Sequence, residues 1–329
     1  MPANLTPEYL KAEKWYKSAT TTDEKILALE RMLAVIPKHK GTDHIKADLR
    51  KKLSKLRDAG TQKKGGAAHV DIFHVPRGGS GQIVLIGTPN CGKSSIVAAM
   101  TNAKVNVADF PFATSAPVPG MAMFEDVKIE LVDMPPITAD YSAPGQVGTY
   151  RNCDIIAIVI DLSGDVLDQI GVCMDFLESR SLLIDSKAPA HDSQGNSLGK
   201  KALCICTKSD VAEAGAFESL KELVEHPFEF VEISVETGEG LDELAGTFFR
   251  LLDIMRVYAK PPGKPPDMSD PFTLPVGSTV TDLAHVVHRQ LAEKLKFARI
   301  WGAGVHDGQS TQRNHVLNDK DIIELHFSK

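Results

Sequence analysis

The sequence has few cysteines and no long hydrophobic run. Its 329 residues include 5 cysteines, an odd number with no Cys-x-x-Cys pair, which argues against a disulfide scaffold and against a cysteine zinc site. The longest unbroken apolar run, Ile155–Ile160, is far shorter than the about 18 residues that a membrane-spanning helix needs. The first residues also lack the apolar stretch of a secretory signal. We therefore expect a cytoplasmic protein without a membrane span.

Charge is unevenly distributed along the chain. Residues 1–66 carry 15 Lys and Arg against 8 Asp and Glu, whereas residues 67–258 carry 13 against 27. A basic segment of this kind favours a polyanionic partner, and nucleic acid is the usual one. A helical hairpin with lysines on its solvated face would have the same composition, so charge alone leaves both interpretations open.

Capping signals and apolar periodicity predict three helices in residues 1–59. The first opens with Thr6 as a cap before Pro7, and Thr21 offers a capping box for the second. Pro37 should end that second helix near Ile36. The third helix carries an apolar stripe on an otherwise basic surface, formed by Ile45, Leu49, Leu53 and Leu56.

From residue 83 onwards, short apolar segments alternate with helical patterns. Strands are expected at Ile83–Ile86, Val127–Val132, Ile155–Ile160, Ala202–Cys206 and Phe230–Ile233, with a short additional one near Val70–Val75. Helices are expected at Lys93–Thr101, Val166–Ser181 and Leu241–Tyr258. This alternation predicts an α/β fold with a doubly wound, mostly parallel sheet that is covered on both faces.

A proline-rich stretch, Lys260–Pro271, is typical of a linker to a small α+β domain. In that domain we expect strands at 272–274, 298–301 and 321–327 and a helix at 281–295. The chain thus divides into a basic helical region (1–66), an α/β domain (67–258) and a small C-terminal domain (259–329).

One segment carries a specific phosphate-binding pattern. The sequence GTPNCGKS matches G-x-x-x-x-G-K-[ST] between an apolar strand and a predicted helix, which is the context that a P-loop requires. Backbone N–H groups of such a loop surround the phosphates, and Lys93 would reach the β- and γ-phosphates. The expected nucleotide-binding residues of this segment are Gly87, Thr88, Pro89, Asn90, Cys91, Gly92, Lys93, Ser94 and Ser95.

Three oxygen-bearing side chains are candidate Mg²⁺ ligands. The Ser94 hydroxyl can ligate the ion directly, and Asp133 follows a strand, as a carboxylate that holds Mg²⁺ through water should. Thr114 is the candidate switch threonine, which would ligate Mg²⁺ only when a γ-phosphate is present.

The residues after two further strands indicate which base is bound. Asp210, in the segment Thr207-Lys208-Ser209-Asp210, can accept two hydrogen bonds from the N1–H and N2–H₂ edge of guanine. Adenine lacks that donor pair and would leave a buried carboxylate unpaired. A backbone N–H in Ser234-Val235-Glu236 could contact the guanine O6. GTP and GDP are therefore favoured, and an ATPase or kinase would require ATP to compete for this site.

The segments GTPNCGKSS, FPFATSAPVPG, LVDMPP, TKSD and ISVETGEGL resemble the Obg branch of translation-factor-like GTPases. The tail from Val257 to Lys329 resembles a TGS domain, a β-grasp module, and the whole arrangement is similar to the developmentally regulated GTP-binding (DRG) proteins. The resemblance implies guanine-nucleotide binding, Mg²⁺ dependence and association with ribosomes or RNA through the basic helices and the TGS-like domain. It also leaves room for a stabilising partner protein.

The chain departs from this family at several positions. The polar excursion around Asp185–Lys201 is much shorter than the insertion of DRG proteins, and Thr207 stands where asparagine is usual. Family members have a glycine at the position of Pro136, and its N–H contacts the γ-phosphate. Proline has no N–H, so we expect weaker discrimination of GTP from GDP.

Catalysis also looks incomplete, because Ile137 occupies the position where Ras-like enzymes have a water-orienting glutamine. Related GTPases with an apolar residue there use K⁺ held through a P-loop asparagine, and Asn90 matches that position. The expected catalytic residues are therefore Lys93, Thr114 and Asn90. We expect a regulatory GTPase with slow hydrolysis, and the alternative is a nucleotide-dependent binding module that hardly hydrolyses GTP.

Overall fold

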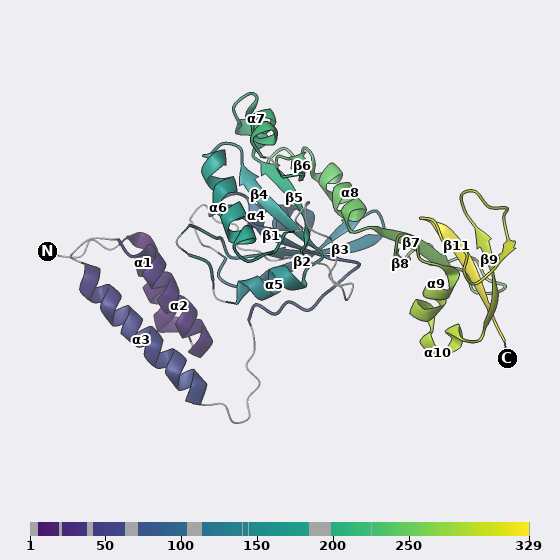
Figure 1. The fold of residues 1–329 in the computed structure, drawn as a ribbon, viewed down its shortest axis with the longest axis horizontal. Helices are drawn as coiled ribbons and strands as arrows, with labels where there is room; N and C mark the ends of the chain where they lie inside the picture. Colours follow the sequence, from purple (N-terminus) through teal and green to yellow (C-terminus); the bar gives the residue numbers. More distant parts are fainter. Residues whose placement is uncertain are drawn as a thin grey trace.

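The computed structural model describes residues 6–19, 22–37, 42–62, 72–103, 114–139, 141–143, 145–183, 199–224 and 226–328. A helical unit, an α/β domain and a small sheet domain follow one another along the chain (Figure 1). Most of the polar excursion around 185–201, and the part of FPFATS before Thr114, lie outside the described ranges. No helix within those ranges is long and apolar enough to cross a membrane.

The N-terminal unit consists of α1 (Pro7–Ser18), α2 (Thr22–Val35) and α3 (Asp43–Gln62). The cap expected at Thr6 is present, because its side chain accepts a hydrogen bond from the backbone N–H of Tyr9 over 3.2 Å. The expected box at Thr21 lies outside the described residues. The predicted stripe of α3 is confirmed as core, since Leu49 and Leu53 are buried against α1 and α2. The basic side chains Arg50, Lys51, Lys52 and Lys55 are exposed.

The α/β domain is built on a six-stranded sheet with the order β2-β3-β1-β4-β5-β6. Its strands are β1 (Gln82–Ile86), β2 (Val118–Phe124), β3 (Val127–Asp133), β4 (Ile155–Asp161), β5 (Lys201–Thr207) and β6 (Glu229–Glu232). Every neighbouring pair is parallel except β2 and β3. The predicted doubly wound α/β fold is confirmed. The sequence did not predict β2, because Pro119 and Gly120 interrupt its pattern; an edge strand tolerates such residues.

Helices cover both faces of this sheet. On one face, α4 (Lys93–Met100) and α8 (Leu241–Leu251) pack against Ile83 and Leu85 of β1. On the other, α5 (Gln146–Asn152), α6 (Val166–Glu178) and α7 (Ala216–Leu223) contribute to the core that contains Val84 and Ile86. Because alternate residues of β1 enter two different cores, the strand is apolar throughout, as a parallel central strand should be.

Two expected elements are corrected. The helix expected over 241–258 ends at Leu251, and residues 254–259 form strand β7 (Ile254–Ala259) instead. Met255, Val257 and Tyr258 of this strand are buried. Sequence pattern alone does not distinguish a short buried strand from the last turns of a buried helix. Near Val70–Val75, the described part (72–75) forms a turn followed by residues without regular secondary structure.

The C-terminal sheet has the order β10-β9-β11-β7-β8. Besides β7 it contains β8 (Phe272–Pro275), β9 (Leu295–Trp301), β10 (Gln309–Thr311) and β11 (Asp321–Phe327), with α9 (Val280–Val287) and α10 (Arg289–Ala292) beside it. The single helix expected over 281–295 is divided at His288, whose backbone is extended (φ −159°, ψ 96°). Strand β7 spans the boundary expected after residue 258 and pairs with β11 and β8.

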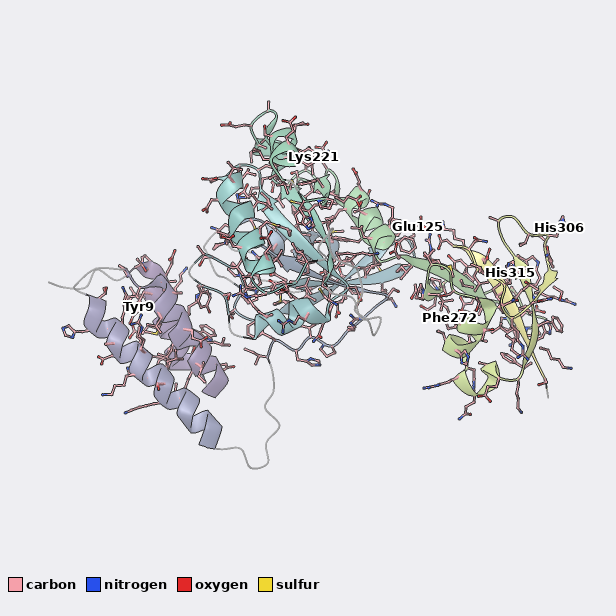
Figure 2. The ribbon with its side chains drawn as sticks, viewed as in Figure 1. Tyr9, Glu125, Lys221, Phe272, His306 and His315 are labelled. Carbon is pink, nitrogen blue, oxygen red and sulfur yellow. The ribbon has the colours of Figure 1, made fainter. Side chains whose placement is uncertain are left out.

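Arg256 of β7 joins the C-terminal sheet to the α/β domain. Its guanidinium donates two hydrogen bonds to Asp319, from Nη2 to Oδ2 over 2.7 Å and from Nε to Oδ1 over 3.1 Å. It also pairs with Glu125 and Asp126 in the turn between β2 and β3, and Figure 2 shows Glu125 where the two domains meet. Arg256 is only 3% exposed, and a buried charge of this kind requires such partners. The tip of the β2–β3 hairpin is thereby held against the C-terminal domain.

Candidate nucleotide-binding site

The candidate site lies at the carboxyl ends of the parallel strands. The P-loop follows β1, Asp133 ends β3, Thr207 ends β5 with Asp210 soon after it, and Ser234 comes soon after β6. The carboxyl ends of parallel strands share one edge of a sheet, and ligands of open α/β folds bind there. The loops that the sequence analysis selected therefore meet at one edge (Figure 1).

The P-loop closes around the side chain of Lys93. Its buried ammonium donates hydrogen bonds to the carbonyl oxygens of Gly87 (3.0 Å) and Thr88 (2.8 Å). Gly87 must lack a side chain, because a Cβ there would lie 2.5 Å from Cys91 Sγ and 2.7 Å from the carbonyl oxygen of Val159. Since both carbonyl partners of Lys93 are neutral, the ammonium and the N-terminus of α4 together favour an anion.

The three expected Mg²⁺ ligands lie together beside this loop. Asp133 Oδ2 accepts hydrogen bonds from Ser94 Oγ (2.6 Å) and Thr114 Oγ1 (3.0 Å), and the two hydroxyl oxygens are 3.1 Å apart. Burial raises the pKa of Asp133, against the hydrogen bond from Ser94 and the charge of Lys93. In the described structure Asp133 Oδ1 is buried without a hydrogen-bond partner. A buried carboxylate oxygen beside two hydroxyls is a donor set that fits Mg²⁺.

An open pocket lies beside the P-loop. It is lined by Gly92, Ser95, Thr207, Lys208, Asp210, Val211, Val235 and Glu236. Asp210 Oδ1 accepts a hydrogen bond from Ser234 Oγ over 2.7 Å, which orients the carboxylate. Ser234 is itself buried, and its Oγ also accepts from the N–H of Thr237 over 3.1 Å. The residues expected around a base thus surround one pocket.

Thr207 ties the base-binding loop to the P-loop. Its hydroxyl lies 2.8 Å from the carbonyl oxygen of Cys91 and 3.2 Å from that of Ile160, and its single hydrogen is shared between these two acceptors. The side chain that replaces the usual asparagine therefore still connects the two loops.

Two residues that were not expected from the sequence support the same loops. Asp161, at the end of β4, forms an ion pair with Lys208, whose backbone is left-handed (φ 60°). The amide of Gln169 exchanges two 2.9 Å hydrogen bonds with the backbone of Asp161. The position of Asp161 directly after an apolar strand was the signal that could have identified it; Gln169 has no comparable signal.

The segment after Asp133 is turned towards the protein interior. The N–H of Ile137 donates a hydrogen bond to the carbonyl oxygen of Gly87 over 3.1 Å, and the Ile137 side chain is fully buried. The nearest downstream carboxamide, Gln146, is also fully buried, and neither its oxygen nor its nitrogen has a hydrogen-bond partner in the described structure. Ile137 thus has no polar side-chain atom that could orient a water molecule, and the Gln146 amide is not open to solvent.

The N-terminal helices contact the site, which the sequence did not predict. A small, partly open cavity is lined by Trp15, Leu27, Arg31, Thr114, Ser115, Pro135, Tyr141 and Ala143. Arg31 is buried enough to lower the pKa of its guanidinium to about 10. Residues of α1 and α2 therefore lie against Thr114 and against the segment after Asp133.

Comparison with known proteins identifies two domains. Residues 82–187 match the 50S ribosome-binding GTPase family, and residues 255–326 match the TGS domain. The chain is 25% identical to an uncharacterized GTP-binding protein of Methanocaldococcus jannaschii, with 92% of each chain covered. It is 26% identical to Developmentally-regulated G-protein 2 of Arabidopsis thaliana (92% of this chain, 90% of the relative). It is also 26% identical to Ribosome-interacting GTPase 1 of Saccharomyces cerevisiae (93% and 99%).

A similar solved structure is the YchF GTPase of Schizosaccharomyces pombe. It aligns with a TM-score of 0.54 at 12% identity and covers 76% of this chain and 99% of its own. This similarity supports the fold alone.

Proposed function

We propose that this chain, which has a GTPase domain and a C-terminal TGS domain and is similar to developmentally regulated G-proteins, is a slow, Mg²⁺-dependent GTPase and a regulatory switch. The proposal depends above all on the cluster of Ser94, Thr114 and Asp133 beside Lys93. Ser94 and Thr114 would ligate Mg²⁺ directly, and Asp133 would hold it through water. The ion would neutralise charge on the β- and γ-phosphates.

Guanine-nucleotide selection is assigned to the pocket around Asp210. The hydrogen bond from Ser234 holds one carboxylate oxygen in place, and Thr207 keeps the pocket attached to the P-loop. Backbone N–H groups of Ser234, Val235 and Glu236 are proposed to contact the base edge. Titration with a fluorescent GDP, with and without EDTA, tests both parts: Mg²⁺ removal should weaken binding, whereas ATP should not compete.

Slow hydrolysis follows from the position of Ile137. A buried isoleucine cannot orient the attacking water, so Lys93 and Thr114 remain as the residues next to the phosphates. Asn90 is exposed at the tip of the P-loop, where it could help to hold K⁺. Hydrolysis should be faster in KCl than in NaCl, and Asn90→Ala should abolish the difference. Equal rates in both salts would contradict the role of K⁺.

A nucleotide-dependent binding module with little hydrolysis is the second candidate. It is favoured by the buried Ile137 together with Pro136, which has no N–H for a γ-phosphate. Single-turnover phosphate release, measured with and without ribosomes, separates the two candidates. Release that ribosomes accelerate supports the GTPase, and no release in either condition supports the binding module.

Association with ribosomes or RNA in the cytoplasm is part of the proposal. A relative is named as a ribosome-interacting GTPase, and α3 presents exposed basic side chains that suit a polyanion. Co-sedimentation with ribosomal subunits under GTP analogue, GDP or no nucleotide tests this association. Reversing the charges of Lys51, Lys52 and Lys55 should weaken it if α3 is the contact, and should leave it intact if the TGS domain or a partner protein is.

A further inference from the structure

Helix α2 uses two different faces. Leu29 and Met32 are buried inside the helical unit, against residues of α1 and α3. Leu27, which is 9% exposed, belongs instead to the core of the α/β domain, together with Val75 and Ala143. Trp15 of α1 packs partly buried against that same core. The α1–α2 hairpin is therefore docked on the α/β domain by a small apolar contact of its own.

The hairpin is docked beside Thr114, the residue that is proposed to respond to the γ-phosphate. Trp15 and Leu27 line the same cavity as Thr114, Ser115 and Pro135. Thr114 is also the residue whose hydroxyl donates to Asp133 over 3.0 Å. One wall of this cavity is thus formed by a residue whose hydroxyl is turned towards Asp133.

We propose that Trp15 and Leu27 are positioning residues that determine selectivity for GTP over GDP. They pack on Thr114 and Pro135 when Thr114 is turned towards the metal site, and thereby stabilise the arrangement that binds a γ-phosphate. The inference rests on the proposed function, because it assumes that GTP and GDP bind at this site.

Thermodynamic linkage predicts how docking of the hairpin changes the affinity for GTP relative to GDP. A contact shifts an equilibrium between two states only if it is better made in one of them. Loss of the γ-phosphate would release Thr114 and Ser115, and the hairpin would then lose part of the contact that docks it. The hairpin therefore favours GTP, and GTP favours docking of the hairpin by the same factor. This contact would therefore contribute selectivity for GTP over GDP at a site where Pro136 has no N–H to donate to the γ-phosphate.

The first test compares two leucines of α2 in the full chain. Leu27→Ala should lower the ratio of GTP-analogue affinity to GDP affinity by at least about 5-fold, the lower end of typical coupling between sites. Its GDP affinity should stay unchanged. Leu33→Ala is the matched control, because Leu33 packs inside the helical unit, and it should leave the ratio unchanged. Leu27→Met keeps a side chain of similar size and should leave the ratio close to that of the parent chain. A Leu27→Ala ratio equal to that of the parent chain would overturn the proposal.

The second test does not depend on a destabilising variant. The chain has 2 tryptophans, so Trp301→Phe leaves Trp15 as the only one. Its emission should shift to shorter wavelength when GTP analogue replaces GDP, because docking removes the indole from water. Identical emission with both bound nucleotides would refute the hairpin's role and leave the proposed function intact. If neither nucleotide binds, the proposed function itself is wrong.

Discussion

The backbone N–H of Ile137 donates to the carbonyl oxygen of Gly87 over 3.1 Å and so ties the segment after Asp133 to the first residue of the P-loop. Pro135 and Pro136 precede Ile137 and have no N–H of their own. The first amide donor after Met134 is thus engaged with the P-loop carbonyl.

Restoring an amide donor should strengthen selectivity for GTP. Pro136→Gly should raise the affinity for GTP analogue relative to GDP by about 10- to 150-fold, the range for one hydrogen bond to a charged group. Pro136→Ala also restores the N–H and separates this effect from added flexibility. Equilibrium titration of each variant measures the ratio. Unchanged selectivity in both variants would show that Pro136 does not weaken contact with the γ-phosphate.

The choice of base should depend on Asp210. Asp210→Asn replaces a carboxylate that accepts two hydrogen bonds by an amide that both accepts and donates. GDP affinity should fall about 10- to 150-fold, and xanthosine diphosphate, whose base carries a carbonyl in place of the 2-amino group, should bind better than before. Glu236→Gln, in the same pocket, is the control and should change little. An unaltered base preference would remove the basis for guanine recognition here.

The hydroxyl of Thr207 should contribute to both stability and binding. Thr207→Val keeps the shape but leaves the carbonyl oxygen of Cys91 without this donor, at a cost of about 1–3 kcal/mol in the free energy of unfolding. Thr207→Ser keeps the hydroxyl and should lose much less. Denaturant unfolding with and without GDP provides both measurements. Equal stability of the Val and Ser variants would contradict the role of this hydrogen bond.

Gln146 should be a site where an apolar replacement stabilises the fold. Its amide is fully buried, and neither polar atom has a hydrogen-bond partner in the described structure. Gln146→Leu removes that desolvation cost and should raise the free energy of unfolding by about 1–3 kcal/mol. Thr149→Val on the same helix is the contrasting variant. It should lower the free energy of unfolding, because the Thr149 hydroxyl donates to the carbonyl oxygen of Phe73. A lower melting temperature for Gln146→Leu would show that its amide has a partner in solution.

Arg256 should connect the domains in a pH-dependent way. Arg256→Met should cost about 1.5–3 kcal/mol of stability at pH 7, whereas Arg299→Met at an exposed site should cost little. The hydrogen bond from Arg256 holds the pKa of Glu125 below its usual 4.5. A lowered pKa means that the contribution is complete above pH 4.5 and is lost as pH falls through the lowered value. The difference between parent and variant in thermal unfolding should therefore shrink below pH 4.5. A difference that persists at lower pH would exclude these carboxylates as the cause.

The sequence predicted the parts of this protein that depend on local pattern. Apolar runs identified five of the six strands of the first sheet, and polar residues at or soon after their ends marked Asp133 and Asp210. Because parallel strands end at one edge of a sheet, both side chains were expected at that edge. The chemical roles given to them remain predictions.

Contacts between distant surfaces were decided only by the tertiary structure. Nothing in the spacing of α2 indicates that Leu27 enters a different core from Leu29, or that it lies against Thr114. Arg256 likewise meets Glu125 only because strand β7 leaves the first domain as a strand and not as the end of a helix. Periodicity along a chain specifies which faces are apolar. It does not specify which apolar faces meet, because that depends on the shapes of elements far apart in sequence.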